Sequence, residues 1–215
     1  MLPGQEEQQR INDLAREFEA ATGAQALAAV TGKADGYPEI PWKAFALGAA
    51  FAALCVVGDE LLAPDWASIE SPMIDVIIIL GTGVFACLLT MWLPAAGRLL
   101  LSGERAGAQV RRYAEGLFLR REVFRTAERS GVLILVAGFE RRATIQLDTG
   151  IGKHFTREDI VAIIDTMTPH VRTGALTDAF RAGFEGLARH LAVKGVKFKT
   201  HGNELPDGAI VEKGQ

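Results

Sequence analysis

The 22 residues from Val76 to Gly97, VIIILGTGVFACLLTMWLPAAG, contain no charged side chain. A helix crosses the hydrocarbon core of a bilayer with about 20 apolar residues. The alternative is a buried helix of a soluble core, but such helices are usually shorter and keep a polar edge. The segment therefore predicts a transmembrane helix.

A second apolar segment, Ala44–Gly58, precedes it and is flanked by Lys43 and Asp59. Counted from 41 to 62 it reaches 22 residues, with its charges near the ends. Tryptophan favours membrane interfaces, and the three tryptophans lie near the expected boundaries: Trp42, Trp66 and Trp92. We therefore expect a transmembrane hairpin over 41–101, with spans at about 41–62 and 76–97, and hence the lipid bilayer as a partner.

Small residues recur along both apolar segments. They are Ala44, Gly48 and Ala52 in the first, and Gly83 and Cys87 in the second. Small residues let membrane helices pack closely, although the general alanine richness of this region explains the same spacings. The two cysteines, Cys55 and Cys87, are expected to be small apolar residues within the spans rather than reactive thiols.

The charges around the spans predict their orientation. The connection from Gly58 to Asp75 has five acidic residues and neither lysine nor arginine, whereas Arg98, Arg105, Arg111 and Arg112 follow the second span. Short loops rich in lysine and arginine remain in the cytoplasm. We therefore expect a plasma-membrane protein with two spans, an external acidic loop and both termini cytoplasmic. Asp75 then marks the outer boundary of the second span.

The remainder of the sequence has the periodicities of a water-soluble domain. Helical spacing covers Glu104–Arg129, and Thr156 begins a capping-box pattern, close to a helix beginning at Arg157. Pro169 is expected to bend or end that helix. A further amphipathic helix follows Gly174 and ends at Gly195. The strand candidates are 131–138, 142–148 and 209–211.

The first 22 residues contain acidic side chains and no apolar signal region, and Ile11, Leu14 and Phe18 recur at helical spacing. They predict an amphipathic helix, and Gln25–Thr31 a strand after it. A lone hairpin is too small to be stable, so this strand is expected to join the downstream strands. The soluble domain would then be discontinuous, formed by 1–40 and 104–215.

The segment GVLILVAGFERRATIQLDTGI, residues 131–151, resembles the strand–Glu-Arg–strand–Asp-x-Gly-Ile segment of the TPM domain family. The preceding TAERSG, the later helix pair, the tail segment 203–207 and the N-terminal FEAATGAQALAAV are similar to a bacterial membrane branch of that family. In that branch two membrane helices interrupt the domain. Unlike close relatives, this chain has no tryptophan in 152–164, which weakens any residue-by-residue transfer.

The resemblance implies an α/β fold, a small mixed sheet sandwiched by helices and interrupted here by the two-helix transmembrane hairpin. Some relatives are phosphatases or bind a divalent cation, and others are accessory proteins of membrane complexes. The resemblance therefore leaves open whether this chain is an enzyme.

Carboxylates are the candidate reactive groups. Asp148 ends a strand beside a glycine turn, and it is also the candidate catalytic residue. Asp35 and Glu140 converge with it if the three strands pair as expected, and such hard oxygen ligands suit Ca²⁺ or Mg²⁺. The alternative for Asp148 is an Asx turn that binds its own backbone. Asp159 is expected to cap a helix.

Other kinds of site have little support. The formal net charge of −3 gives no reason to expect nucleic-acid binding. The four histidines, His154, His170, His190 and His201, have no metal-binding spacing. Gly32-Lys33 lacks the frame of a phosphate-binding loop.

Two functions remain. The first is a membrane-anchored interaction or accessory module that binds a protein partner at the cytoplasmic face. The second is a divalent-cation-dependent phosphatase that uses Asp148, Asp35 and Glu140, in which the cation would neutralise phosphate charge and activate a water. A transporter is disfavoured, because two spans form no pathway unless the protein oligomerises. We expect the interaction module.

Overall fold

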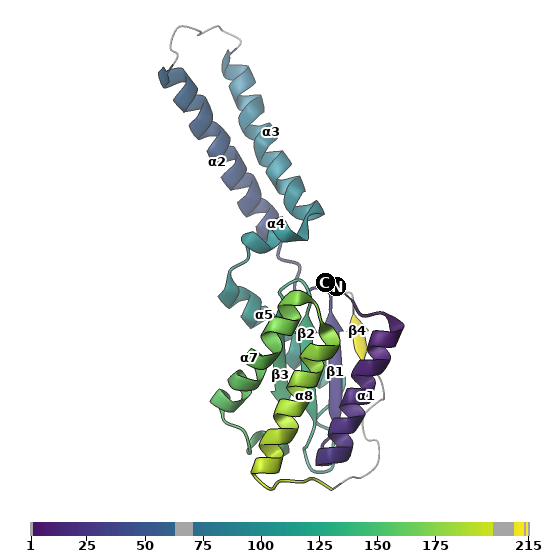
Figure 1. Ribbon diagram of the computed structural model, residues 1–215. Coiled ribbons are helices and arrows are strands. Elements are labelled where there is room, and N and C mark those ends of the chain that lie inside the picture. Colours follow the sequence, from purple (N-terminus) through teal and green to yellow (C-terminus); the bar gives the residue numbers. More distant parts are fainter. Residues whose placement is uncertain (1, 63–70, 200–208, 213, 215) are drawn as a thin grey trace. The chain divides into compact units, whose positions relative to one another are not determined.

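The computed structural model describes residues 2–62, 71–199, 209–212 and 214. The chain divides into two compact units (Figure 1). Unit 1 comprises Met1–Asp35 and Glu104–Gln215, and unit 2 comprises Gly36–Gly103. Trp66, His201 and 203–207 lie outside the described residues. So do Asp65 and Glu70, two of the five acidic residues between Gly58 and Asp75.

Unit 1 is built around a four-stranded sheet in the order β3-β2-β1-β4. In the centre, β1 (Ala26–Thr31) pairs in parallel with β2 (Val132–Ala137). On one edge β3 (Arg142–Leu147) runs antiparallel to β2, and on the other β4 (Ile210–Glu212) runs parallel to β1. The expected strands near 25, 131, 142 and 209 therefore form one mixed sheet.

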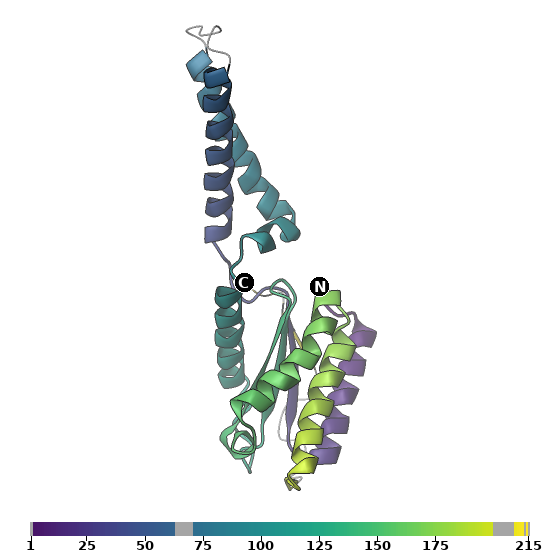
Figure 2. The same cartoon turned by 60° about the vertical axis from the view of Figure 1, so that its left-hand side comes forward.

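Helices cover both faces of this sheet (Figure 2). One face carries α1 (Gln5–Thr22), α7 (Arg157–Thr173) and α8 (Leu176–Val193), and the other carries α5 (Gly103–Arg120). Every residue of β1 and β2 is buried, as expected for strands covered on both sides.

Side chains alternate between these two faces along β2. Ile134 packs in the cluster that contains Met167 and Phe180, whereas Leu133 and Leu135 pack in the cluster that contains residues of α5. The fold class predicted from the sequence, a small mixed sheet sandwiched by helices, is confirmed.

The first turn of α7 has the capping box that its sequence predicts. The Thr156 hydroxyl accepts a hydrogen bond from the Asp159 amide (3.2 Å), and the Asp159 carboxylate accepts one from the Thr156 amide (2.8 Å). The backbone hydrogen bond from Thr156 lowers the pKa of Asp159. Asp159 is thus a capping residue, as expected.

A side-chain cluster ties the short strand β4 to α5. The Tyr113 hydroxyl donates a hydrogen bond to Glu212, and Arg121 Nη2 lies 3.5 Å from Glu212 Oε1. Burial raises the pKa of Tyr113, and the hydrogen bond to Glu212 raises it further. The phenol therefore stays protonated and keeps its donor role through the physiological pH range.

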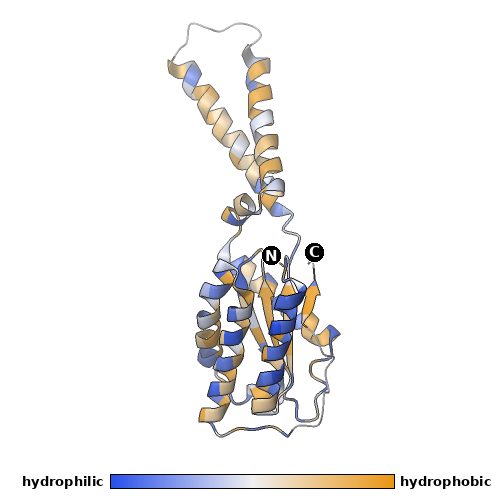
Figure 3. Cartoon of the chain, turned by 45° about the vertical axis from the view of Figure 1, so that its right-hand side comes forward, coloured by the Kyte–Doolittle hydropathy of each residue, from blue (hydrophilic) through white to orange (hydrophobic). Residues whose placement is uncertain are grey.

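Unit 2 consists of α2 (Glu39–Leu62), α3 (Ser71–Trp92) and the short α4 (Pro94–Leu99), which the sequence pattern did not predict. Both long helices contain 21-residue stretches, Glu39–Asp59 and Pro72–Trp92, that are long and apolar enough to span a membrane. Figure 3 shows hydrophobic residues along both.

Two glycines allow α2 and α3 to approach closely. A Cβ at Gly48 would lie 2.8 Å from the Cβ of Ala86, and a Cβ at Gly83 would lie 2.9 Å from the Phe45 ring. Ala44 and Ala52, one turn on either side of Gly48, are buried. The small residues therefore form the contact between the helices, and alanine richness alone does not account for their placement.

One predicted helix boundary was wrong. Helical periodicity continues to Arg129, but α5 ends at Arg120, and Glu122 adopts a positive φ of 50°. The segment instead turns so that the fully buried Val123 packs beneath α5.

Pro169 does not end α7, which continues to Thr173. Proline leaves the carbonyl four residues earlier without its helical hydrogen bond, and at this exposed position solvent can satisfy that carbonyl.

We predict that Gly131→Ala destabilises unit 1. A Cβ at this position would lie 2.1 Å from the carbonyl oxygen of Val123, so backbone must shift, at a cost of roughly 1–3 kcal/mol. Gly116→Ala in α5 is the matched control, because there the neighbouring atom is the flexible end of Arg120, at 3.3 Å. Thermal unfolding of the full chain in detergent should show a lower Tm for the first variant alone, and an unchanged Tm would contradict this packing.

Candidate functional site

The structure separates the three carboxylates that the sequence suggested as metal ligands. The Asp148 amide donates to Gly131 O (2.9 Å), at the start of β2. Glu140 lies in the turn after β2, and Asp35 follows β1, which ends at the same edge because β1 and β2 are parallel. Six residues of β2 separate these ends by about 17 Å. Asp35 and Glu140 therefore share one end of the sheet, and Asp148 lies at the other.

Asp148 caps the short helix α6 (Thr149–Gly152). Its Oδ1 accepts a hydrogen bond from the Thr149 amide (2.7 Å) and lies 3.8 Å from Arg129 Nη1. The side chain is only 5% exposed, and Oδ2 accepts no hydrogen bond from the described residues. This placement corresponds to the local, backbone-binding alternative for Asp148, here as a helix N-cap.

Glu140 is held in the turn between β2 and β3. Its side chain is buried, and Oε1 accepts a hydrogen bond from the Ala34 amide (2.9 Å). The turn is also fixed by main-chain bonds, from Gly138 to Thr31 O and from Phe139 to Gly32 O, each 2.9 Å. Glu140 thus fastens the turn to the segment that follows β1.

The described residues contain no group of three or more histidine, cysteine, aspartate or glutamate side chains placed to hold a metal ion. His190 instead serves the packing of α7 and α8. It stacks on Phe155 with ring centroids 4.4 Å apart, and its Nε2 lies 3.0 Å from His154 O and 3.5 Å from Asp159 Oδ2.

A polar pocket of about 390 Å³ opens beside the β2–β3 turn. We call it the arginine pocket, because three arginines line it together with residues of α7. Its lining is Glu140, Arg141, Arg142, Ala143, Ile164, Asp165, Thr168 and Arg172. The volume falls in the range of small-molecule sites.

The three arginines are exposed, and none forms an ion pair with a carboxylate among the described residues. The side chain of Arg142 lies on the α5 side of the sheet, since Arg142 pairs with Ala137 and its Nη1 would lie 3.5 Å from a Cβ at Gly107. Arg141 and Arg142 come from the turn and the start of β3, and Arg172 from the last turn of α7. Arg141 has a positive φ of 51°, which is uncommon for a residue other than glycine. The main-chain hydrogen bonds of the β2–β3 turn and the bond between Glu140 and Ala34 hold Arg141 in that conformation.

The sequence pattern did not single out this pocket. The pattern predicts Glu140 as a metal ligand in the joint between two strands, Arg141 as part of that joint, and Arg142 as the start of the second strand. Arg172 is 30 residues further along the chain, on an element predicted separately. The one available signal was the charged run Glu140-Arg141-Arg142 between two apolar strands.

We predict that Asp148 has a structural role. Asp148→Asn keeps a good N-cap and should unfold at nearly the wild-type denaturant concentration, whereas Asp148→Ala should lose about 0.5–2 kcal/mol of unfolding free energy, as removal of an N-cap does. Chemical denaturation of the detergent-purified chain measures both. Equal destabilisation by the two variants would show that the negative charge, rather than the cap, stabilises this position.

Residues 100–190 match the family model described as the TPM domain. No curated protein matches the sequence significantly. Among solved structures, the chain is similar to the NMR structure of BA42 protein from the psychrophilic bacterium Bizionia argentinensis, with a TM-score of 0.55 and 15% identity over 97% of this chain and 94% of that chain.

At this identity the structural similarity bears on the fold alone. The matched residues begin just before α5 and extend into α8, so they include the β2–β3 hairpin and the arginine pocket. Residues 100–190 thus match a TPM domain, and the sandwiched mixed sheet agrees with that family's fold.

Proposed function

We propose that this protein is an integral inner-membrane protein whose TPM domain acts as an interaction or accessory module at the cytoplasmic face. The observation that supports it is the exposed apolar surface of unit 2. Among the described residues, 25 large apolar side chains are exposed, seven of them on α2 and twelve on α3.

These side chains need an apolar environment. Leu54 is 71% exposed, Ile77 64% and Phe85 66%, and burial of one such side chain is worth about 1.5–3 kcal/mol. A core helix of a soluble protein would cover them with protein. Among the described residues of unit 2, the long helices contact each other along a narrow seam that includes Ala44, Gly48 and Gly83. Lipid is therefore the surrounding that satisfies the remaining apolar side chains.

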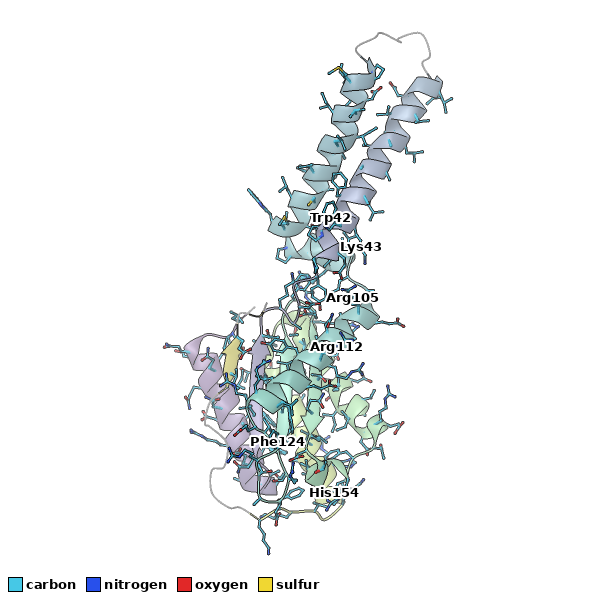
Figure 4. The ribbon with its side chains drawn as sticks, turned by 180° about the vertical axis from the view of Figure 1, so that it is seen from behind. Trp42, Lys43, Arg105, Arg112, Phe124 and His154 are labelled. Carbon is cyan, nitrogen blue, oxygen red and sulfur yellow. The ribbon has the colours of Figure 1, made fainter. Side chains whose placement is uncertain are left out.

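The proposed orientation follows from charge. The acidic residues gather around the α2–α3 connection, and arginines follow α3 and continue along α5, where Figure 4 marks Arg105 and Arg112. The same figure marks Trp42 and Lys43 at the start of α2, a pair typical of a membrane interface. This pattern favours a cytoplasmic unit 1.

The accessory role rests on the TPM resemblance, since some relatives are accessory proteins of membrane complexes. The alternative, a divalent-cation-dependent phosphatase, has less support, because Asp148 lies at the opposite end of the sheet from Asp35 and Glu140.

We predict that charges at the centres of the spans prevent stable insertion. An arginine there costs about 2.5–3.5 kcal/mol, so Phe51→Arg/Leu80→Arg should be lost from carbonate-washed membranes. Leu119→Arg is the control, because Leu119 is 64% exposed but lies on α5. If the double variant stays in the membrane as firmly as the wild type, α2 and α3 do not span it.

We predict opposite labelling of two introduced cysteines in a Cys55→Ala/Cys87→Ala background. Asp59→Cys, near the end of α2, should react with a membrane-impermeant maleimide applied outside spheroplasts. Val193→Cys, at the end of α8 and 83% exposed, should react only after permeabilisation. The reverse result would place the TPM domain outside the cytoplasm and overturn the proposed orientation.

A further inference from the structure

The edge of the sheet at β3 is open among the described residues. β3 ends the strand order and pairs there with β2 alone (Figure 1), whereas β4 covers part of the opposite edge. We propose that this open edge, together with the arginine pocket, binds the extended carboxyl-terminal segment of a partner protein as an added antiparallel strand. The inference rests on the proposed interaction role for the existence of a partner, and on unit 1 alone for the binding surface.

The main-chain hydrogen bonds show which backbone groups of β3 face outward. The Asp148 amide donates to Gly131 O (2.9 Å), so the even-numbered residues of β3 turn their peptide groups toward β2. The peptide groups of Ala143, Ile145 and Leu147 therefore point away from the sheet, and they form no hydrogen bond with the described residues. Each offers one N–H and one C=O to an incoming strand.

β3 has none of the features that usually protect an open edge. Such edges are commonly blocked by proline, lysine, a bulge or a very short strand. β3 contains neither proline nor lysine, and it pairs with β2 in an unbroken register over six residues. Arg142, its first residue, is its one charged side chain. An edge of this kind is suited to recognition by the addition of a strand.

The two faces of β3 set the pattern that the added strand needs. Ala143, Ile145 and Leu147 pack in the apolar cluster that contains residues of α7. The alternate side chains, Thr144 and Gln146, are polar and lie on the α5 side. Because paired residues of neighbouring strands share a face, we expect the partner segment to alternate in the same way, with its apolar side chains toward α7.

The arginine pocket determines which end of the partner segment binds. Arg141 directly precedes β3 and Arg172 lies in the last turn of α7, and both line the pocket. Both are exposed, and neither forms an ion pair among the described residues. A strand antiparallel to β3 has its carboxyl end at this point. A terminal carboxylate accepts paired hydrogen bonds from guanidinium groups, whereas an internal segment brings no charge here.

Asp165, the exposed acidic residue of the pocket, is set apart from Arg172. It lies seven residues earlier in α7, which is about 10 Å along the helix axis. It forms no ion pair among the described residues. A strand covers the same distance in about three residues. We therefore expect a basic residue two positions before the terminal residue, where a long side chain on the α7 face reaches Asp165.

The test is the binding of fluorescein-labelled Thr-Val-Thr-Lys-Thr-Val, with a free carboxyl terminus, to the full chain in dodecyl maltoside, measured by fluorescence anisotropy. The amidated peptide should bind at least about tenfold more weakly, because hydrogen bonds to a charged group are lost. Arg141→Gln/Arg172→Gln should weaken the free-acid peptide by a similar factor and leave the amidated peptide unchanged. Equal binding of the two peptides, or no saturable binding up to about 1 mM, would overturn the proposal.

Methylation of the peptide backbone tests the strand pairing itself. An antiparallel strand turns every second N–H toward its neighbour. In the proposed register these are the amides of the valine and lysine residues, whose side chains share the α7 face. N-methylation at the lysine should therefore weaken binding, whereas N-methylation at the threonine that follows it should leave binding near that of the parent peptide. Equal losses at the two positions would show that the peptide is not bound as a strand and would overturn the proposal.

Two further variants separate a built site from general attraction. Arg10→Gln/Arg189→Gln removes two exposed arginines outside the pocket and should bind the free-acid peptide as the wild type does. Asp165→Asn should weaken binding of the lysine peptide, but not of a peptide with norleucine in its place. If the pocket and control arginine pairs cause equal losses, the effect is one of net charge and the proposal is wrong.

Carbonate extraction and cysteine labelling report insertion and orientation separately from peptide binding. A protein that inserts as proposed but does not distinguish the free-acid peptide from the amidated one contradicts this inference alone. A protein that fails to insert but binds the free-acid peptide through Arg141 and Arg172 contradicts only the proposed membrane function.

Discussion

The parallel pairing of β1 with β2 is the constraint on which the rest of unit 1 depends. It joins residues 26–31 to residues 132–137, in a register that runs from Ala26 opposite Val132 to Thr31 opposite Ala137. Parallel strands need a crossover connection. Here that connection contains all of unit 2 and then α5, which returns along the sheet and covers one of its faces. A separate apolar unit is tolerated inside the domain because a crossover exists at this point in any case.

The same pairing decides what lies at each end of the sheet. Because β1 and β2 run in one direction, the residues after β1 and the turn after β2 meet at one edge, where Ala34 donates to Glu140. The antiparallel return of β3 carries Asp148 back to the opposite edge. The end with the exposed arginines is also the end from which the chain leaves for the apolar helices.

Local patterns predicted the elements well and some of their ends poorly. The strands, the capping box at Thr156 and the discontinuous sheet followed from alternation, capping chemistry and the need of a small sheet for more strands. The end of α5 at Arg120 could not be predicted in this way. The spacing of apolar residues up to Arg129 is compatible with a longer helix and equally with a buried turn. The turn is selected by tertiary packing: Val123 is buried under α5, and its carbonyl oxygen lies so close to Gly131 that a side chain there would clash. Pro169 is the opposite case. It favours a helix break locally, but it lies on an exposed face of α7 and the helix continues past it to Thr173.

The sequence by itself determined the segregation of the chain into apolar and amphipathic parts, because hydrophobic spacing and charge are local properties that each segment carries alone. It also predicted Asp159 as a capping residue, and it left Asp148 open between a metal ligand and a residue that binds its own backbone. Only the tertiary structure decided which side chains converge. Asp35, Glu140 and Asp148 were equally plausible partners along the chain, and strand direction separated the last from the others. Arg172 lines the same pocket as Arg141 because α7 packs beside β3, a contact between elements that no local pattern encodes.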